Sequence, residues 1–247
     1  MGLDVPPLQG IVHDLKAYSK GDFGISLLSK QNIRPLIFNR LFHSFLLAVT
    51  SLSFAIILSL FLGILAAAHP DGGWDRLCET FSAITSALPL TWLGPVLMIF
   101  FALKLKVVSV DHNIFLPTLT LGLGLSAFWS RMIRDRVRET LSRGAAPGAR
   151  ARGIPEWRVL LKYGFAPTAG PLLAFLGTQL GVLVSGAAVV EVIFTWPGLG
   201  ALLIEAVLRR DYPIVEAVTF IAATLCVLGT ILGDVAHHAF DPRRKVR

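Results

Sequence analysis

Side chains that could do chemistry are few in this sequence, and they form no known catalytic or metal-binding pattern. Cys78 and Cys226 are isolated and form no CxxC pair, so the sequence predicts neither a disulfide framework nor a zinc site. His237 and His238 stand close to acidic residues. Adjacent helical residues point about 100 degrees apart, so these imidazoles would not chelate together as an i, i+4 pair would. We therefore predict no metal site and no cofactor.

The motifs of several enzyme classes are also missing from the sequence. There is no GxxxxGK[ST] phosphate loop, so the chain is not predicted to hydrolyse ATP by that mechanism. HExxH and GxSxG are absent, which removes the parts of a metalloprotease or a serine hydrolase. GLGLSA at 122–127 fails the GxGxxG spacing and lies in an apolar run, where we interpret it as helix packing. The sequence thus predicts a protein without a catalytic centre of its own.

Composition indicates which elements must position the remaining polar groups. Of the 247 residues, 54% are hydrophobic and 16% are charged, against about 25% charged in an average soluble domain. The net charge of +7 could indicate nucleic-acid binding. However, the basic residues stand in short blocks beside long apolar runs, which is typical of topology determinants in a membrane protein. The predicted surroundings are a lipid bilayer, and no nucleic acid is expected.

Five apolar segments are long enough to cross a bilayer, since a hydrocarbon core of roughly 30 Å needs about 20 residues. They lie at approximately 44–68, 82–104, 114–130, 169–194 and 214–236. The third is short and contains Pro117, Gly122 and Gly124, which spanning helices tolerate when neighbours satisfy the backbone. Small residues in the fourth, including Gly177 and Gly181, are spaced for close helix approach. We predict an all-α membrane protein, a polytopic helical bundle with five spanning helices.

The distribution of basic residues predicts the orientation. The regions 131–168, 69–81 and 237–247 hold nine, one and four Lys or Arg, which makes fourteen of the 23 in the chain. The positive-inside rule places this side, and with it the C-terminus, in the cytoplasm. Five crossings then put residues 1–43 outside, although no signal peptide precedes them. We expect a lost upstream helix or an earlier start in the gene; the alternative is a short tail translocated unaided.

Three regions follow from this topology: an external segment at 1–43, a membrane domain at 44–240 and a cytoplasmic tail at 241–247. The membrane domain contains the long cytoplasmic loop at about 131–168. The first part of this loop favours helix, and Pro147, Gly148, Gly153 and Pro155 divide the rest into two short helices. Such a helix–turn–helix offers a rigid contact to a soluble partner. The alternative is a charged loop that only anchors the topology.

Glu191 is an ionisable residue near the outer end of the fourth apolar segment. A charge at mid-membrane costs about 2.5–3.5 kcal/mol on insertion scales, so such a residue normally faces a cavity or a partner. It could line a path through the membrane or hold the turn that follows at 196–200, and its place near the interface favours the turn. After this turn, residues 201–208 could form a short helix on the outer surface.

Several phrases resemble a known family. The segment Ala149–Leu173, ARARGIPEWRVLLKYGFAPTAGPLL, resembles the cytoplasmic EAA loop of ABC importer permeases, in particular the dipeptide, oligopeptide and nickel branch. GDFGIS at 21–26 resembles the periplasmic GDxGxS element of that branch, and VVEVIFTWPGLG at 189–200 resembles its signature before the last external loop. RRDYP at 209–213 and DPR at 241–243 also match. The chain is similar to these binding-protein-dependent inner-membrane components from about Gly21 onward.

The resemblance implies a transport subunit of a bacterial inner membrane, and not an enzyme. Such a subunit forms half of the translocation path for peptides or a related small solute such as nickel, beside a second, homologous permease. ATP is hydrolysed on two separate ATPase subunits, and an extracytoplasmic substrate-binding protein delivers the solute. Family members have six spanning helices, the first of them upstream of GDxGxS. The resemblance therefore implies that the first helix is missing here.

The family pattern also implies roles for individual residues. Contact with the ATPase is expected from seven positions of the loop, namely Ala149, Arg150, Ala151, Arg152, Gly153, Pro155 and Glu156. Gly153 would permit the sharp turn, and the charged members would bind the partner or, alternatively, face lipid headgroups. Contact with the binding protein or the partner permease is expected around the external turn, at Glu191, Trp196, Pro197, Gly198, Gly200, Asp211, Tyr212 and Pro213.

Two other functions are compatible with a multi-spanning chain. A secondary transporter driven by an ion gradient would be expected to show internal repeats and discontinuous helices around a mid-membrane site, and we find no convincing repeat. A truncated membrane subunit that does not transport is the other alternative. No cluster of His, Cys or carboxylates marks a metal path, which favours peptides over nickel as the solute.

Overall fold

The computed structural model describes residues 16–108, 113–143 and 145–240, so the DPR phrase and the predicted tail at 241–247 lie outside the described residues. The described chain is helical, and its extended pairing is a single bridge between Ile25 and Asn32. The helices are α2 (Ile33–Ala68), α3 (Gly73–Ala87), α4 (Leu90–Met98), the π-helix η1 (Ile99–Lys104), α5 (Phe115–Ser142), α6 (Ala146–Ala151), α7 (Glu156–Arg158), the π-helix η2 (Val159–Phe165), the 3-10 helix η3 (Ala166–Thr168), α8 (Ala169–Gly186), α9 (Ala188–Ile193), α10 (Leu199–Arg209) and α11 (Tyr212–Phe240).

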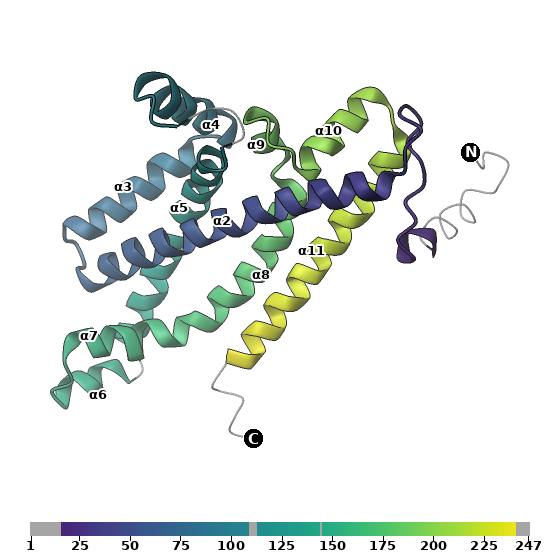
Figure 1. The fold of residues 1–247 in the computed structure, drawn as a ribbon. Coiled ribbons are helices and arrows are strands. Elements are labelled where there is room, and N and C mark those ends of the chain that lie inside the picture. The colour runs from purple at the N-terminus through teal and green to yellow at the C-terminus, as the bar shows by residue number, and fades with distance from the viewer. Residues whose placement is uncertain (1–15, 109–112, 144, 241–247) are drawn as a thin grey trace.

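Helix α2 runs through the length of the bundle and packs along α5 (Figure 1). It begins at Ile33, well before the apolar run predicted at 44–68, because the Asn32 side chain accepts a hydrogen bond from the Arg34 amide and caps the first turn. The α2–α5 contact is close where Gly122 lies. A Cβ atom there would approach the Ser51 carbonyl oxygen to 3.2 Å and would collide with Phe54. Gly122 therefore serves helix packing, as predicted.

Helices α8 and α11 form the second extensive helix pair, and glycines lie where their backbones meet. A Cβ atom on Gly177 or Gly181 would collide with the backbone of α11, at Gly233 and Cys226 respectively. The predicted close approach of this glycine-containing helix is confirmed, and α11 is the helix that it approaches. Such contacts rely on backbone-to-backbone packing, which is the usual way in which helices associate in lipid.

The predicted count of five spanning helices is not confirmed. By length and composition, three helical stretches of the described chain can cross a membrane, Ile33–Ala68, Glu156–Val184 and Tyr212–Ala239, and a bent pair makes up to four. The predicted segment 114–130 lies almost entirely in the N-terminal half of α5, and α5 is not among these stretches. The predicted segment 169–194 is also divided: α8 ends at Gly186 and α9 begins at Ala188.

The prediction of one continuous helix at 82–104 is wrong. Helix α3 ends at Ala87, and α4 begins at Leu90 after a bend of 103° between the two axes. The cause is Pro89, which has no amide hydrogen to continue the helix and disfavours helical geometry at the preceding residue. Leu88 is accordingly extended, with φ −89° and ψ 119°.

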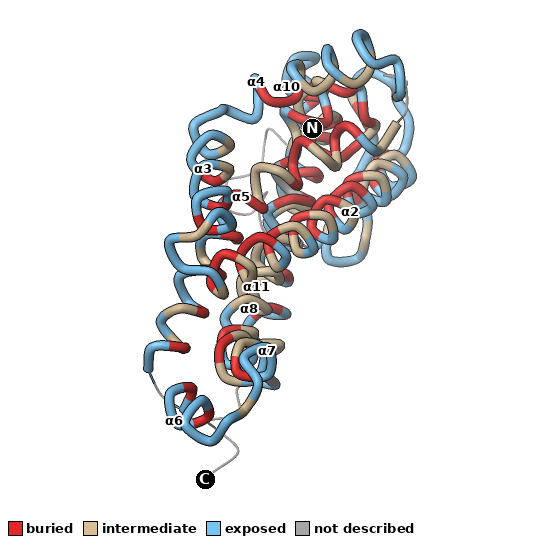
Figure 2. The backbone as a smooth tube through the Cα atoms, turned by 90° about the vertical axis from the view of Figure 1, so that its left-hand side faces the viewer, coloured by how far each residue is buried: buried red, intermediate tan, exposed pale blue. Residues whose placement is uncertain are grey.

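In the part of the chain that the structure describes, the buried residues form three apolar groups. A central one joins α2, α5, α8 and α9 around Leu47, Leu121 and Trp129. A second packs the start of α2 against α10 and α11, and a third packs α5 against the segment containing Val159. Figure 2 shows buried faces along α2 and α5, whereas α6 is mostly exposed. The protein thus has a packed middle and two ends, with α6 and α7 at one end and α9 and α10 at the other (Figure 1).

Candidate functional site

The segment 146–165, here called the 146–165 hairpin, contains the two predicted short helices. Gly153 has a φ of +74° and ends the first of them, with its amide donating to the Arg150 carbonyl at 2.9 Å. This conformation is one that glycine adopts readily, so the predicted role of Gly153 in the turn is confirmed. Pro147 lies in the first turn of α6, a position that proline tolerates. The second helix does not end within the loop but continues through η2 and η3 into α8.

Arg150 and Glu156 bind each other across the Gly153 turn. The Arg150 Nη2 and Nε atoms lie 2.5 Å and 3.2 Å from Glu156 Oε1, and Nε lies 3.1 Å from Oε2. The hydrogen bond to Glu156 raises the pKa of Arg150 above its ordinary value, so this guanidinium stays charged. The two side chains, both expected as separate partner contacts, are thus paired with each other, while Arg152 is exposed.

The 146–165 hairpin is anchored on α5. Ala149 and Val159 are fully buried and pack with Val137 and Leu141 of α5. The opposite side of the hairpin is exposed and carries Trp157, whose ring lies 5.0 Å from the Arg158 guanidinium carbon. The hairpin therefore has a fixed inner side and a free outer side at one end of the bundle (Figure 1).

The turn at 194–200, at the other end of the bundle, is held by Glu191. Its carboxylate is fully buried and accepts hydrogen bonds from Ser44 Oγ at 2.5 Å and from the Ala201 amide at 2.8 Å. Ser44 Oγ in turn accepts from the Leu199 amide at 2.7 Å. This geometry supports the interpretation that Glu191 holds the turn, since its oxygens are directed at α2 and at the start of α10.

Trp196, Gly198 and Gly200, which were also predicted at this turn, are buried. The Trp196 indole nitrogen donates to the His43 carbonyl at 3.1 Å, which ties the turn to α2 a second time. A Cβ atom on Gly198 would overlap the Glu191 carboxylate, and one on Gly200 would overlap Ala188. The short helix predicted at 201–208 is confirmed as part of α10.

Asp211 joins two phrases that are far apart in the sequence. It is 3% exposed and accepts hydrogen bonds from Ser26 Oγ at 2.5 Å and from the Leu27 amide at 3.1 Å. Residues of GDFGIS thus lie against RRDYP, at the junction where Arg210 adopts a φ of +57° and α11 begins. Tyr212, next in the chain, is 60% exposed and faces outward.

Replacing Asp211 with alanine is expected to lower the free energy of unfolding by about 1.5–3 kcal/mol, the usual contribution of hydrogen bonds to a charged group. The Leu27 amide would lose its acceptor, so its hydrogen exchange should become faster, which exchange mass spectrometry would measure. Ser26→Ala removes only one of the two hydrogen bonds and should leave the Leu27 amide protected. Asp22→Ala is the control, since among the described residues the Asp22 carboxylate bonds only to the Gly24 amide of its own loop. Unchanged exchange at Leu27 in the Asp211 variant would contradict the assignment.

Comparison with known proteins decides the family. Residues 59–246 match the family described as binding-protein-dependent transport system inner membrane component. The chain is 33% identical over 247 residues to the glutathione transport system permease protein GsiC of Escherichia coli strain K12, covering 98% of this chain and 81% of that protein. GsiC of Pectobacterium atrosepticum is 34% identical over 248 residues with the same coverage. The chain belongs to this permease family.

Solved structures agree with the fold of the permease. It is similar to an inward-facing structure of the MetNI methionine ABC transporter, with a TM-score of 0.73, 19% identity, and coverage of 84% of this chain and 97% of that one. An amino acid ABC transporter crystallised with histidines gives a TM-score of 0.59 at 16% identity, covering 85% and 94%. By its family match, the permease is a multi-pass inner-membrane subunit of an ABC importer, and the ion-gradient alternative is set aside.

One buried charge cluster of the permease was not predicted. Asp75 of α3 binds Arg134 at 3.1 Å and Arg138 at 2.8 Å, both on α5, and the side chains of Asp75 and Arg134 are about 10% exposed. Arg138 also donates to the Ala66 carbonyl of α2 at 2.9 Å. The sequence offered only a weak signal, because Arg134 and Arg138 have i, i+4 spacing but stand among nine basic residues of the 131–168 region.

Proposed function

We propose that the permease forms half of a membrane path for small peptides such as glutathione, paired with a second, homologous permease. The curated relatives reported above are named for glutathione transport, and glutathione is itself a small peptide. This supports peptides over nickel, the other solute expected from the sequence. The substrate would be delivered by an extracytoplasmic binding protein, which the family description of binding-protein-dependent transport supports.

The energy for transport would come from two separate ATPase subunits. The orientation that we propose places the 131–168 region and the C-terminus in the cytoplasm and residues 1–43 outside, with 44–240 as the permease domain and 241–247 as the tail. The excess of basic residues on the proposed cytoplasmic side supports this arrangement. The 146–165 hairpin then faces the ATPase, and the 194–200 turn faces the binding protein.

The observation that carries the coupling role is the construction of the 146–165 hairpin. Its inner side is fixed on α5 through Ala149 and Val159, and the Gly153 turn is clamped by the Arg150–Glu156 pair. Its outer side exposes Arg152, and its second helix is continuous with α8. A rigid element that joins an exposed surface directly to a candidate spanning helix can pass movement of a bound partner into the bundle. We therefore assign the ATPase contact to residues 149–156.

The external residues divide into two roles under this proposal. Glu191, Gly198 and Asp211 are buried and hold the backbone in place. Tyr212 is exposed beside them, and Leu208 is 79% exposed at the end of α10. An aromatic and an aliphatic side chain on a rigid support are suited to protein contact, because aromatic residues are enriched at interfaces. We propose that these exposed residues meet the binding protein or the partner permease.

Charge reversal at the outer side of the hairpin tests the coupling role. In proteoliposomes containing the permease with its ATPase and partner permease, Arg152→Glu is expected to lower ATP-dependent uptake of labelled glutathione about tenfold, equivalent to about 1.4 kcal/mol of lost contact. The ATPase should also co-purify less with this variant. Arg76→Glu, at an exposed arginine of α3 outside the hairpin, is the matched control and should transport normally.

Three results would count against parts of this proposal. Normal uptake with Arg152→Glu would remove residues 149–156 from the ATPase contact. ATP hydrolysis that glutathione and its binding protein do not stimulate would reject the substrate but not the coupling. A wild-type complex that assembles with its ATPase yet transports nothing with ATP would favour a non-transporting subunit.

A further inference from the structure

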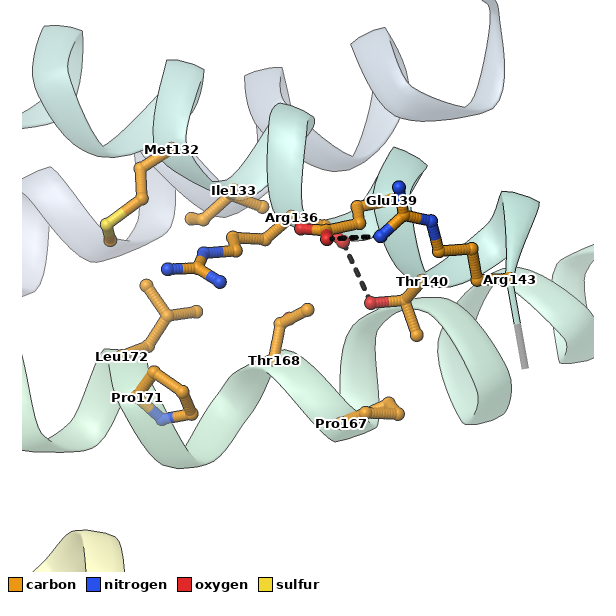
Figure 3. Close-up of a pocket in the computed structure, with 10 residues that line it drawn as sticks. All are labelled: Met132, Ile133, Arg136, Glu139, Thr140, Arg143, Pro167, Thr168, Pro171 and Leu172. Carbon is orange, nitrogen blue, oxygen red and sulfur yellow. Dashed lines mark hydrogen bonds and ion pairs between the residues drawn. The ribbon is translucent and has the colours of Figure 1, made fainter. Parts of the chain in front are cut away.

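A groove of about 430 Å³ opens between the C-terminal half of α5 and the start of α8 (Figure 3). Arg136, Glu139 and Arg143 line it from α5, and Thr168 lines it from the opposite side. Arg143 is paired with Glu139 at 3.2 Å. Within the described chain, the Arg136 guanidinium has no hydrogen-bond or ion-pair partner, and Figure 3 shows it directed across the groove towards Leu172 and Pro171. The groove therefore presents one uncompensated positive charge.

An apolar cavity of about 250 Å³ adjoins this groove and shares Ile133 and Leu172 with it. Its other lining residues come from α2, α5, η2 and α8 and include Ile56, Trp129 and Leu176. Leu172 and Leu176 belong to the candidate spanning stretch Glu156–Val184. The positive groove thus lies directly beside an apolar cavity that is lined by α8 and by neighbouring helices of the bundle.

A cationic groove beside an apolar cavity has the chemistry of a phospholipid site. Guanidinium groups form strong, charge-assisted hydrogen bonds to phosphate oxygens, and basic pockets between membrane helices bind the headgroups of anionic lipids. An acyl chain would fill the apolar cavity, which a free phosphate ion could not use. We propose that this site binds an anionic phospholipid, with the phosphate at Arg136 and one acyl chain beside Leu172 and Leu176.

This lipid site goes beyond the proposed transport function and does not depend on it. The bound lipid would bridge α5 and the start of α8, which follows the 146–165 hairpin in the chain. The phosphate would neutralise Arg136, which otherwise faces the apolar side chains of Leu172 and Pro171. Arg143 would add a second, weaker attraction, since its charge is already shared with Glu139.

Native mass spectrometry of the full-length permease in detergent tests the site. The wild-type chain is titrated with phosphatidylglycerol and, separately, with phosphatidylcholine of the same acyl chains. We expect phosphatidylglycerol to bind at least about fivefold more tightly, and Arg136→Gln to remove most of this preference. The factor corresponds to the roughly 1 kcal/mol that a basic residue contributes near anionic lipid. Phosphatidylcholine binding should be unchanged by the substitution.

Two variants and one competitor make the test specific. Arg136→Lys keeps the charge and should keep a preference for phosphatidylglycerol, and Arg131→Gln, at an exposed arginine of α5 that lines neither cavity, should behave as wild type. Inorganic phosphate at tens of millimolar should not displace the lipid. Equal binding of the two lipids by the wild-type chain, equal losses in the Arg131 and Arg136 variants, or full displacement by phosphate would each overturn the proposal. The comparison of lipids needs no variant, so it stands even where a variant folds poorly.

Discussion

Replacing Gly198 with alanine is expected to lower the free energy of unfolding by about 3 kcal/mol, because the added methyl group would overlap the buried Glu191 carboxylate. The carboxylate cannot withdraw without breaking its hydrogen bonds to Ser44 and to the Ala201 amide. The turn at 194–200 should therefore open, and the start of α10 should detach from α2. Thermal unfolding of the permease in detergent would measure the loss.

A double-mutant cycle separates this overlap from a general effect of alanine. Glu191→Ala alone should also destabilise, because it leaves the Ser44 hydroxyl and the Ala201 amide without their acceptor. In the double variant the methyl group occupies space that the carboxylate has left, so the combined loss should be smaller than the sum by about 1 kcal/mol or more. If the two losses of stability were strictly additive, Gly198 and Glu191 would not be in contact. Gly73→Ala is the matched control, since a Cβ atom there meets nothing within 4 Å.

Replacing Asp75 with alanine is expected to lower the free energy of unfolding by about 3–5 kcal/mol, the usual result when one partner of a buried ion pair is removed. Among the described residues, Arg134 would keep only the exposed Asp135, at 3.0 Å, as a partner, and Arg138 would keep only the Ala66 carbonyl. Because Asp75 lies on α3 and both arginines lie on α5, α3 should separate from the bundle. Limited proteolysis between α2 and α3, followed together with the melting temperature, would detect this.

Glu79→Ala provides the comparison for Asp75, since Glu79 is an exposed acid one turn further along α3. Its stability should stay within about 0.5 kcal/mol of wild type, as for most surface substitutions. If the Asp75 and Glu79 variants had the same melting temperature, the charge cluster would not hold α3 in place. The stability of Asp75→Asn should lie between those of the two alanine variants, because its amide oxygen can still accept a hydrogen bond from one arginine.

The helical fold was predictable because apolar runs and basic blocks are properties of the sequence alone. The bend at Pro89 was missed for the same reason: Leu88, Pro89 and Leu90 are all apolar or neutral, so hydropathy does not fall where the helix ends. Proline in the first turns of a helix is tolerated, as at Pro117 in α5, so its presence alone does not decide between a break and a continuation.

The sequence motifs of the site could be recognised, but the contacts between their residues could not be predicted. GDFGIS and RRDYP could each be matched to a family, yet only the fold shows that Ser26 binds Asp211, 185 positions away. Ser44 was missed because a serine in an apolar helix commonly bonds to its own backbone, and nothing local directs it to Glu191. Arg150 and Glu156 were predicted as partner contacts, but their pairing depends on the angle of the Gly153 turn.

The stretch Glu156–Val184 is one helical path of 29 residues that starts in the 146–165 hairpin and ends beside the turn at the opposite end of the bundle. At 1.5 Å per residue it is about 40 Å long, so it can act as a lever arm. A tilt of about 5° at the hairpin would carry its far end sideways by about 3.5 Å, which is close to the width of a methyl group. Because Gly177 and Gly181 bring this stretch into backbone contact with α11, α11 would have to move with it.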